Sequence, residues 1–539
     1  MNHQPQVPVA SLSLSVPDAS RGPRREYLLA AFIGMALMTA VQSGSWGIAG
    51  NDGYYHVKMA LMLPEVGYIQ SFPWLHWTIF RDQFVSHHHG FHTLLAPFVW
   101  LAQVTTGDPA LGGKLASILA MGATFALVAA VLRKLHMPHR WLWLLLIGAA
   151  PWHFWLRQAY VRAPMVGLPL LLLAVLWHLR GRTLAIGILG FVFTHVYGGG
   201  VLFPLVSIGF LGGAWLNGQS LALPLRQCLY AIVGVVLGFV INPYFPANLG
   251  FLFTQIFVTG LGAPAEVGSE WKPYVAWNLV MQAAVLGIVY FACLLRRLKS
   301  AAPTRSDELA LFLLNMAFLL LTLKSRRFVE YWPVFAVLSA AALHATGLAP
   351  QPVSQSHTPR QVRAILASTV TLGVCAAVNL WISRDNIHPS HNLTAIRDAL
   401  TFLQAESPPG SLVLTDDWDI FPVCFYFNHH NTYAVGLDPE FTRTRYPTLW
   451  ERYRRITRAE LPAKLEETHE EDGSDEISYD DIAIRFDADY VLVASDHRPL
   501  FKALTGRSKQ FTLIYPPDWK SGAAQPAITL FEVQAKIGQ

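Results

Sequence analysis

The chain has 539 residues, of which 53% are hydrophobic and only 14% are charged, and its formal net charge is +5. This composition argues against a soluble protein, and the small net charge argues against a nucleic-acid-binding surface, because such surfaces are strongly basic. Runs of about 18 or more apolar residues recur up to about residue 382, which is the pattern of transmembrane helices. The sequence therefore predicts a polytopic α-helical membrane protein that contacts membrane lipids and binds no nucleic acid.

The N-terminal segment, residues 1–25, is polar and ends in the basic run Arg21-Gly22-Pro23-Arg24-Arg25. It lacks the pattern of a cleaved signal peptide, so we expect a disordered cytoplasmic tail and then a retained first helix at about 27–47. The apolar segment 92–104 is short for a span. We interpret it as a helix in the membrane interface, because the basic cluster 133–140 then falls on the cytoplasmic side, as the positive-inside rule favours.

The remaining spans alternate across the membrane from that point. We predict about eleven transmembrane helices in a domain covering residues 26–383 of the plasma (inner) membrane, with the N-terminus in the cytoplasm. Two long external loops are expected, one at 48–92 and one at 243–273. The predicted spans are 27–47, 111–132, 141–156, 163–179, 184–198, 201–216, 228–242, 274–295, 307–323, 327–346 and 364–383.

Residues 384–539 differ in character and are predicted to form an external, periplasmic-side α/β domain. The segment is polar and contains a helical stretch at 391–405. Short runs rich in β-branched and aromatic residues predict strands. These runs lie at 411–415, 432–435, 490–494, 511–515 and 527–533.

The loop 48–92 is predicted to be catalytic. It leaves the first helix through Asn51-Asp52-Gly53-Tyr54-Tyr55-His56, and a carboxylate at a membrane edge is costly unless it has a partner or a task. We therefore predict that Asp52 and His56 are catalytic and that Tyr55 contacts substrate. Trp74 and Trp77 are of a kind that suits the membrane–water interface. The loop also holds six of the 20 histidines of the chain, namely His56, His76, His87, His88, His89 and His92.

The consecutive histidines at 87–89 allow two interpretations. Adjacent side chains cannot all point to one side, so at most two of them could share a metal ion, and no Cys cluster or HExxH pattern supports such a site. Hydrogen bonding to a sugar or a phosphate is the alternative, and His88 and His89 are predicted to bind substrate in this way.

Several basic residues fall on the predicted external side, against the charge bias of the other loops. Arg326 and Arg327 begin the tenth helix, Arg157 and Arg162 lie in the turn between the third and fourth helices, and Lys272 ends the second external loop. Guanidinium groups bind phosphate in a bidentate manner, so we predict that these residues bind the substrate's phosphate. Contact with lipid headgroups, or snorkelling from a helix end, is the alternative.

The second external loop also carries two acids, in the segment Gly-Ala-Pro-Ala-Glu266-Val-Gly-Ser-Glu270-Trp-Lys-Pro. Both Glu266 and Glu270 are candidate catalytic residues. The alternative is that they are exposed and solvated loop residues.

Together these features resemble the GT-C glycosyltransferases, which include oligosaccharyltransferase catalytic subunits, protein mannosyltransferases and aminoarabinose transferases. The resemblance rests on the motif of residues 51–56, a helix start at His89-Gly90-Phe91, many spans, and an external domain that opens with Leu414-Thr-Asp416-Asp417-Trp418-Asp419. It implies a GT-C-like fold and the transfer of a sugar from a polyprenyl-phosphate-linked donor, outside the membrane, to an acceptor whose identity stays open.

The resemblance also implies roles for single residues. In that family the acid of the first loop, here Asp52, serves as catalytic base or helps to hold a metal, and an acid of a later external loop, here Glu266 or Glu270, assists. The family's acidic pair after the third helix is replaced in this chain by Arg157 and Arg162. This replacement argues against a divalent metal cofactor and makes the two arginines resemble phosphate ligands.

Two other functions are consistent with a chain of this kind. A transporter or flippase of a lipid-linked or anionic substrate would carry polar residues at mid-membrane, whereas here they cluster at one face, apart from His195 and Tyr197. A non-catalytic assembly protein would bind partners through its tail, and Asp416, Asp417 and Asp419 would then be surface acids at a strand end.

Overall fold

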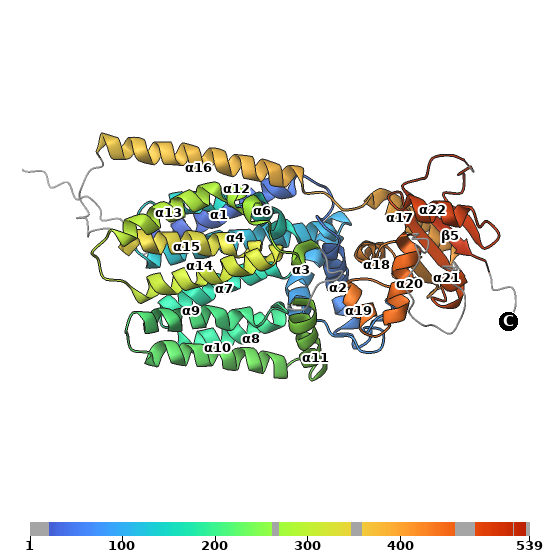
Figure 1. Cartoon of the computed structure of the whole chain (residues 1–539), viewed down its shortest axis with the longest axis horizontal. Helices are drawn as coiled ribbons and strands as arrows, with labels where there is room; N and C mark the ends of the chain where they lie inside the picture. Colours follow the sequence, from blue (N-terminus) through green and yellow to red (C-terminus); the bar gives the residue numbers. More distant parts are fainter. Residues whose placement is uncertain (1–20, 261–268, 347–357, 459–479, 521, 535–539) are drawn as a thin grey trace, which may run out of the picture.

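The computed structural model describes residues 21–260, 269–346, 358–458, 480–520 and 522–534. Most helices lie side by side in one bundle, and the C-terminal part of the chain, which holds a β-sheet, lies at one end of this bundle (Figure 1). Residues 1–20 of the tail predicted at 1–25, and the acidic residue Glu266, lie outside the described residues. Residues 21–25 begin helix α1 (Arg21–Gln42), so the prediction of a disordered tail is wrong for them.

The bundle explains the apolar composition of the chain. Within the described ranges, four helices are long and apolar enough to cross a membrane, and six spans result if each of two bent pairs counts as one. The chain is therefore a multi-pass membrane protein. The bundle helices are α1 (Arg21–Gln42), α4 (Ala110–Lys134), α5 (Arg140–Gly148), α6 (Trp152–Ala159), α7 (Pro164–Leu179), α8 (Thr183–Val196), α9 (Leu202–Leu216), α10 (Ala222–Val240), α12 (Ala276–Gln282), α13 (Ala284–Leu298), α14 (Ser306–Lys324), α15 (Trp332–Thr346) and α16 (Pro359–Asp385).

The predicted number of eleven spans is not confirmed, and the reason is helix length. A full crossing needs about 20 residues. Helices α8, α9 and α15 have 14, 15 and 15 residues, and the predicted span 141–156 is divided between α5 and α6.

A sharp bend in the chain separates α6 from α7, whose axes differ by 108°. Pro164 is the first residue of α7, where its missing N–H costs nothing because that group has no partner within the helix. The bend carries Arg157 at the end of α6 and Arg162 in the turn, so both guanidinium groups leave the bundle at one end.

Three helices run across the end of the bundle that faces the C-terminal part (Figure 1). They are α2 (Asp52–Val66), α3 (His89–Thr106) and α11 (Ala247–Phe253). The crosswise course of α3 agrees with the expectation that 92–104 does not cross the membrane. At its start α3 approaches α8 so closely that a Cβ on Gly90 would lie 2.7 Å from the carbonyl oxygen of His195, which only glycine avoids.

All five predicted β-runs of the C-terminal part form strands of one sheet, in the order β2-β1-β3-β5-β4. Strand β1 pairs in parallel with β2 and β3, whereas β5 pairs antiparallel with β3 and β4. The strands are β1 (Leu412–Thr415), β2 (Thr432–Tyr433), β3 (Tyr490–Ala494), β4 (Phe511–Tyr515) and β5 (Ile528–Val533); the helices are α17 (Leu393–Glu406), α18 (Phe421–Phe427), α19 (Pro439–Arg443), α20 (Pro447–Arg458), α21 (Asp480–Ile484) and α22 (Arg498–Thr505).

The first loop covers the β2 edge of this sheet. The backbone N–H groups of His76 and Trp77 donate to the carbonyl oxygens of Tyr433 and Ala434 at 2.8 and 2.9 Å, and the N–H of Tyr433 donates to Trp74 at 2.9 Å. The indole N–H groups of Trp74 and Trp77 also donate to backbone carbonyls of the C-terminal part. These two tryptophans therefore attach the loop to the sheet, and the pairing satisfies an edge that would otherwise be open.

Candidate functional site

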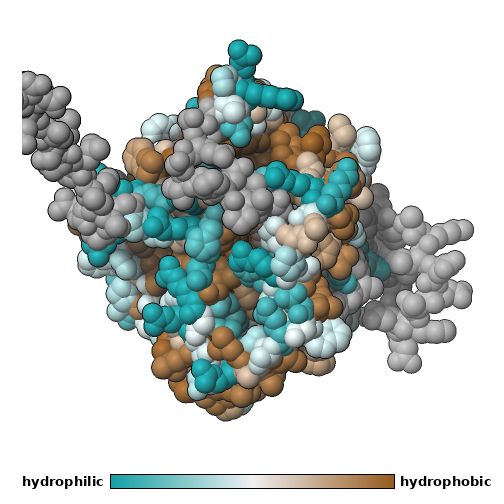
Figure 2. Space-filling model, turned by 90° about the vertical axis from the view of Figure 1, so that its left-hand side faces the viewer, coloured by the Kyte–Doolittle hydropathy of each residue, from teal (hydrophilic) through white to brown (hydrophobic). Residues whose placement is uncertain are grey.

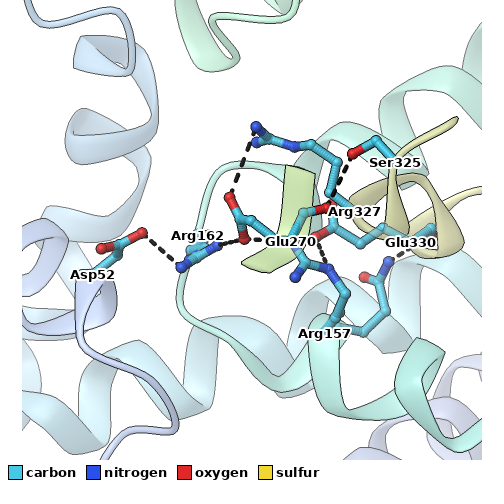
Figure 3. A network of polar contacts seen from close by, with 8 residues as sticks. Asp52, Arg157, Arg162, Glu270, Ser325, Arg327 and Glu330 are labelled. Carbon is cyan, nitrogen blue, oxygen red and sulfur yellow. Dashed lines mark hydrogen bonds and ion pairs between the residues drawn. The ribbon is translucent and has the colours of Figure 1, made fainter. Parts of the chain in front are cut away.

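A chain of ion pairs joins Asp52 to Glu330 through Arg162, Glu270 and Arg157 (Figure 3). The carboxylate of Asp52, the first residue of α2, lies 2.6 Å from a guanidinium nitrogen of Arg162. Arg162 also contacts Glu270 at 2.6 Å, and Glu270 belongs to the short helix η2 (Ser269–Trp271). One guanidinium group thus connects the acids of the first and second predicted loops.

Arg157 extends this network into the protein interior. It lies 3.1 Å from Glu270, and its Nε donates to Oε1 of Glu330 at 2.5 Å. Glu330 ends the short helix η3 (Arg326–Glu330) and is 1% exposed, and the backbone carbonyl of this residue accepts a hydrogen bond from Gln158 at 2.8 Å. A buried carboxylate needs such a partner, so Arg157 and Glu330 stabilise each other.

Arg327 closes the network on the other side of Glu270. Its guanidinium lies 3.8 Å from the Glu270 carboxylate and 4.2 Å from the centre of the Trp271 ring. The hydroxyl of Ser325 donates to the carbonyl oxygen of Glu270 at 3.0 Å. Helices η2 and η3 are thereby held together, and Arg327 has the longest contact with Glu270 of the three arginines.

Asp52 and Glu270, two of the three acids of the network, differ in proton affinity. Burial raises the pKa of the Asp52 carboxyl, and the neighbouring Arg162 only partly opposes this change. For Glu270 burial acts in the same direction, but the three surrounding guanidinium groups outweigh it and hold the pKa well below its usual range. Asp52 is therefore the better proton acceptor of the two, and Glu270 is a permanent negative charge.

A polar cavity of about 500 Å³ opens beside this network. Its walls come from α2, the bend between α6 and α7, helices η2 and η3, and the start of the C-terminal part. The residues with polar side chains that line it include Asn51, Asp52, Tyr55, His56, His88, Arg157, Arg162, Glu270, Arg327, Ser390, Asp417, Asp419 and Asp438.

A second, largely apolar cavity of about 290 Å³ adjoins the first and is lined mainly by helix α11 and the segments 85–89, 197–202 and 321–328. The apolar side chains on its walls include Leu202, Phe239, Phe251, Leu252, Ile256 and Leu321. The two cavities have a common wall. The shared residues are Val85, His87, His88, Gln255, Trp271 and Arg327.

The histidines of the first loop do not converge on one point, because they form three separate hydrogen bonds. His56 and His92 share a hydrogen bond of 2.9 Å, His88 accepts one from the backbone N–H of Gly198 at 3.2 Å, and His89 shares one with His195 at 2.8 Å. Burial lowers the pKa of His56 and of His88 well below the usual range, so both rings are neutral. A neutral imidazole offers one donor and one acceptor, which suits contact with hydroxyl groups.

The structure brings most of the sequence-predicted residues together. Of the predicted catalytic residues, Asp52, His56 and Glu270 line the polar cavity, as do the predicted substrate-binding residues Tyr55, His88, Arg157, Arg162 and Arg327.

The other predicted residues lie elsewhere. His89 lines the apolar cavity, and Lys272 lines a third cavity next to Asp417. Among the described residues, Arg326 lines neither of the two adjoining cavities, whereas the adjacent Arg327 lines both. The Nε of Arg326 donates to the carbonyl oxygen of Pro273 at 3.2 Å. Glu266 lies outside the described residues.

Sequence reasoning missed Glu330 of the ion-pair network and two acids of the polar cavity. Glu330 could have been found by the argument applied to Asp52, since it is also an acid at the start of an apolar helix. Asp417 and Asp419 were considered as surface acids of a strand end, yet both line the polar cavity. Asp416, the third acid of that motif, is buried and pairs with His497 at 2.9 Å. The Asp-Asp-Trp-Asp run was the available signal.

The ion-pair network does not suit a divalent cation between Asp52 and Glu270. A dication needs several carboxylates whose charge is not already compensated. Here Asp52 faces Arg162, and Glu270 faces three guanidinium groups, so positive charge already occupies the position beside each acid. Among the described residues, one group has metal-ligand spacing, Asp416, Asp496 and His497, and it does not include Asp52.

Comparison with solved structures shows a shared fold across most of the chain. The oligosaccharyltransferase AglB from Archaeoglobus fulgidus, in complex with an inhibitory peptide and a dolichol-phosphate, matches with a TM-score of 0.58 and 14% identity over 89% of this chain and 70% of its own. ArnT from Cupriavidus metallidurans bound to undecaprenyl phosphate matches with a TM-score of 0.50 and 13% identity over 95% and 98%.

Arabinofuranosyltransferase AftD from Mycobacteria also matches, with a TM-score of 0.57 and 14% identity, over 95% of this chain but 40% of its own length. No protein-family model and no curated protein sequence matches the chain.

Proposed function

Since the chain has the fold of the GT-C glycosyltransferases, we propose that it transfers a sugar from a polyprenyl-phosphate-linked donor to an acceptor at the external face of the membrane. One observation carries the proposal: an apolar cavity suited to a lipid and a polar cavity suited to a sugar meet at Arg327. In a lipid-linked sugar the phosphate lies between the apolar chain and the polar sugar, just as Arg327 lies between the apolar and the polar cavity.

The donor is proposed to lie across both cavities. Its isoprenoid chain occupies the apolar cavity, its phosphate binds Arg327 at the common wall, and its sugar enters the polar cavity. Arg327 suits phosphate because a guanidinium group offers a planar set of donors, and its contact with Glu270, at 3.8 Å, is long. Two of the similar structures hold a lipid phosphate, dolichol-phosphate in AglB and undecaprenyl phosphate in ArnT, which agrees with this assignment.

Asp52 is the proposed general base. Its carboxylate accepts the proton of an acceptor hydroxyl while the hydroxyl oxygen forms a bond to the anomeric carbon of the sugar. The bond from that carbon to the phosphate oxygen breaks, and the lipid phosphate leaves with the electron pair. A base with a raised pKa accepts a proton more readily, and a cation at the leaving phosphate stabilises the developing charge.

Arg157 and Arg162 were predicted to bind the phosphate of the substrate, and we propose a different role for them. Both guanidinium groups are engaged with carboxylates, at 3.1 Å or less. We propose that they hold Asp52, Glu270 and Glu330 in place rather than bind phosphate, which leaves Arg327 as the phosphate ligand.

The proposed orientation places the polar cavity and residues 384–539 outside the cell. The end of the bundle that faces away from the C-terminal part gathers hydrophilic side chains, with apolar residues around them (Figure 2). The helix ends and loops on that side carry many basic residues, which favours the cytoplasm. They include Arg133, Lys134, Arg140, Arg180, Arg182, Arg226, Arg296 and Lys299.

The test uses the purified protein in lipid nanodiscs with a polyprenyl-phosphate-linked hexose and a panel of hydroxyl-bearing acceptors (sugars, lipids and peptides). Mass spectrometry follows the released polyprenyl phosphate and the glycosylated acceptor. The wild type should release it, and Asp52→Asn should not, because the amide is no base although it is nearly the same size. Glu65→Gln, an exposed change in the same helix, is the control and should behave as wild type. Normal release by Asp52→Asn would overturn the role of Asp52, and no release by the wild type would favour a transporter or an assembly protein.

A further inference from the structure

The residue that precedes Asp52 is held by the C-terminal part of the chain. The side-chain Nδ2 of Asn51 donates to Oδ2 of Asp419 at 2.8 Å and to the carbonyl oxygen of Asp419 at 2.9 Å. Asn51 is 4% exposed, and both residues line the polar cavity. Loss of this contact would leave buried polar groups without partners, so the contact resists opening.

The contact replaces a local one. Asparagine immediately before a helix normally accepts a hydrogen bond from an N–H of the first turn. Asn51 stands at that position of α2, but its side chain makes no such bond. Its amide nitrogen is directed to Asp419 instead, so the start of α2 depends on a residue far away in the sequence.

Asp419 is itself fixed to the sheet by its neighbours. Oδ2 of Asp416 accepts a hydrogen bond from the N–H of Ala494, the last residue of β3, at 2.6 Å. Oδ1 of Asp417 then accepts one from the N–H of Asp419 at 3.0 Å and caps the short helix η4 (Trp418–Ile420). The Asp-Asp-Trp-Asp run therefore transmits the position of the sheet to Asn51.

We propose that Asp419 is a positioning residue for sugar transfer: by holding Asn51 it fixes the start of α2 and directs the Asp52 carboxylate into the polar cavity. This inference rests on the proposed function of Asp52. It makes the C-terminal part a component of the reaction site. Burial and the nearby charges of Asp52 and Asp417 raise the pKa of Asp419 to about 7, and its carboxyl oxygens accept a hydrogen bond in either protonation state.

The experiment measures hydrogen exchange of the backbone amides at residues 53–60, together with kcat and KM for release of polyprenyl phosphate. Asp419→Ala should speed exchange in this segment and lower kcat about ten-fold while the KM for the donor stays constant, because one buried hydrogen-bonding unit is lost. Asn51→Ala should do the same from the other side of the contact. Asp419→Asn keeps an acceptor oxygen and should restore most of the activity.

Two comparisons make the test decisive. The double variant Asn51→Ala/Asp419→Ala should be no worse than either single variant, because both remove the same contact. Asp398→Asn, a half-exposed acid on α17, is the control and should change neither exchange nor kcat. Unchanged exchange in Asp419→Ala and Asn51→Ala, or fully additive losses of kcat, would overturn the proposal. An inactive wild type would instead refute the proposed function, while the exchange data would still report on the contact.

Discussion

The carboxylate of Asp52 and the guanidinium of Arg162 lie 2.6 Å apart, although one residue begins a helix that crosses the bundle end and the other lies in a bend of the bundle itself. Arg162 lowers the pKa of a carboxyl that burial raises, so it sets the pH range in which Asp52 is ionised. This relationship leads to the first prediction.

Arg162→Gln should shift the acidic limb of the pH–rate profile to higher pH. Without the cation the pKa of Asp52 rises further, so a smaller fraction of Asp52 is ionised at any given pH below that pKa. The measurement is kcat for release of polyprenyl phosphate between about pH 5 and 9. This range is chosen because the pKa of Asp52 is raised above its usual value. Arg162→Lys keeps the positive charge, so its acidic limb should lie between those of the wild type and of Arg162→Gln. An unshifted limb in Arg162→Gln would show that Asp52 is not the titrating base.

Arg327→Gln should weaken binding of polyprenyl phosphate by about ten-fold or more, since a charge-assisted hydrogen bond contributes roughly 1.5–3 kcal/mol. The adjacent Arg326→Gln is a matched control, because that side chain donates to the carbonyl oxygen of Pro273 and, among the described residues, lines neither of the two adjoining cavities. It should bind the lipid as the wild type does. Binding can be followed by native mass spectrometry of the protein in nanodiscs. Equal losses in both variants would point to contact with lipid headgroups.

Chelators should leave the transfer rate unchanged. Guanidinium groups already lie beside Asp52 and Glu270, so no divalent cation is needed to balance these acids. The rate would be measured after extensive dialysis against EDTA, and again after addition of Mg²⁺ or Mn²⁺. A loss that either cation restores would contradict this prediction.

Glu330→Gln should destabilise the protein more than it affects donor binding. Among the described residues, the change leaves the buried guanidinium of Arg157 with Glu270 as its one ionised partner, and breaking a buried ion pair costs about 3–5 kcal/mol. A lower melting temperature in detergent would report this loss. Asp398→Asn breaks an exposed pair with Arg397 and should change the melting temperature little, because such pairs contribute about 0–1 kcal/mol.

Sequence alone determined the features that depend on local pattern. The predicted span 111–132 corresponds to α4 at Ala110–Lys134, and the run 490–494 coincides with β3. Asp52 was chosen as a candidate because a carboxylate at a membrane edge carries an energetic cost that is visible in one short segment. The class of a helical membrane protein with a C-terminal α/β segment followed from the same local signals. The GT-C-like fold was implied by the resemblance, and the likeness to solved GT-C structures agrees with it.

Only the tertiary structure decided which charges meet. Arg326 and Arg327 are adjacent and of one kind, yet one contacts the carbonyl oxygen of Pro273 and the other lines both cavities. Arg157 and Arg162, expected at phosphate, lie against Glu270, Glu330 and Asp52. Hydropathy and helical periodicity indicate which side of one segment is buried and which is exposed. An ion pair depends on the relative positions of two segments that packing brings together, and no local pattern contains that information.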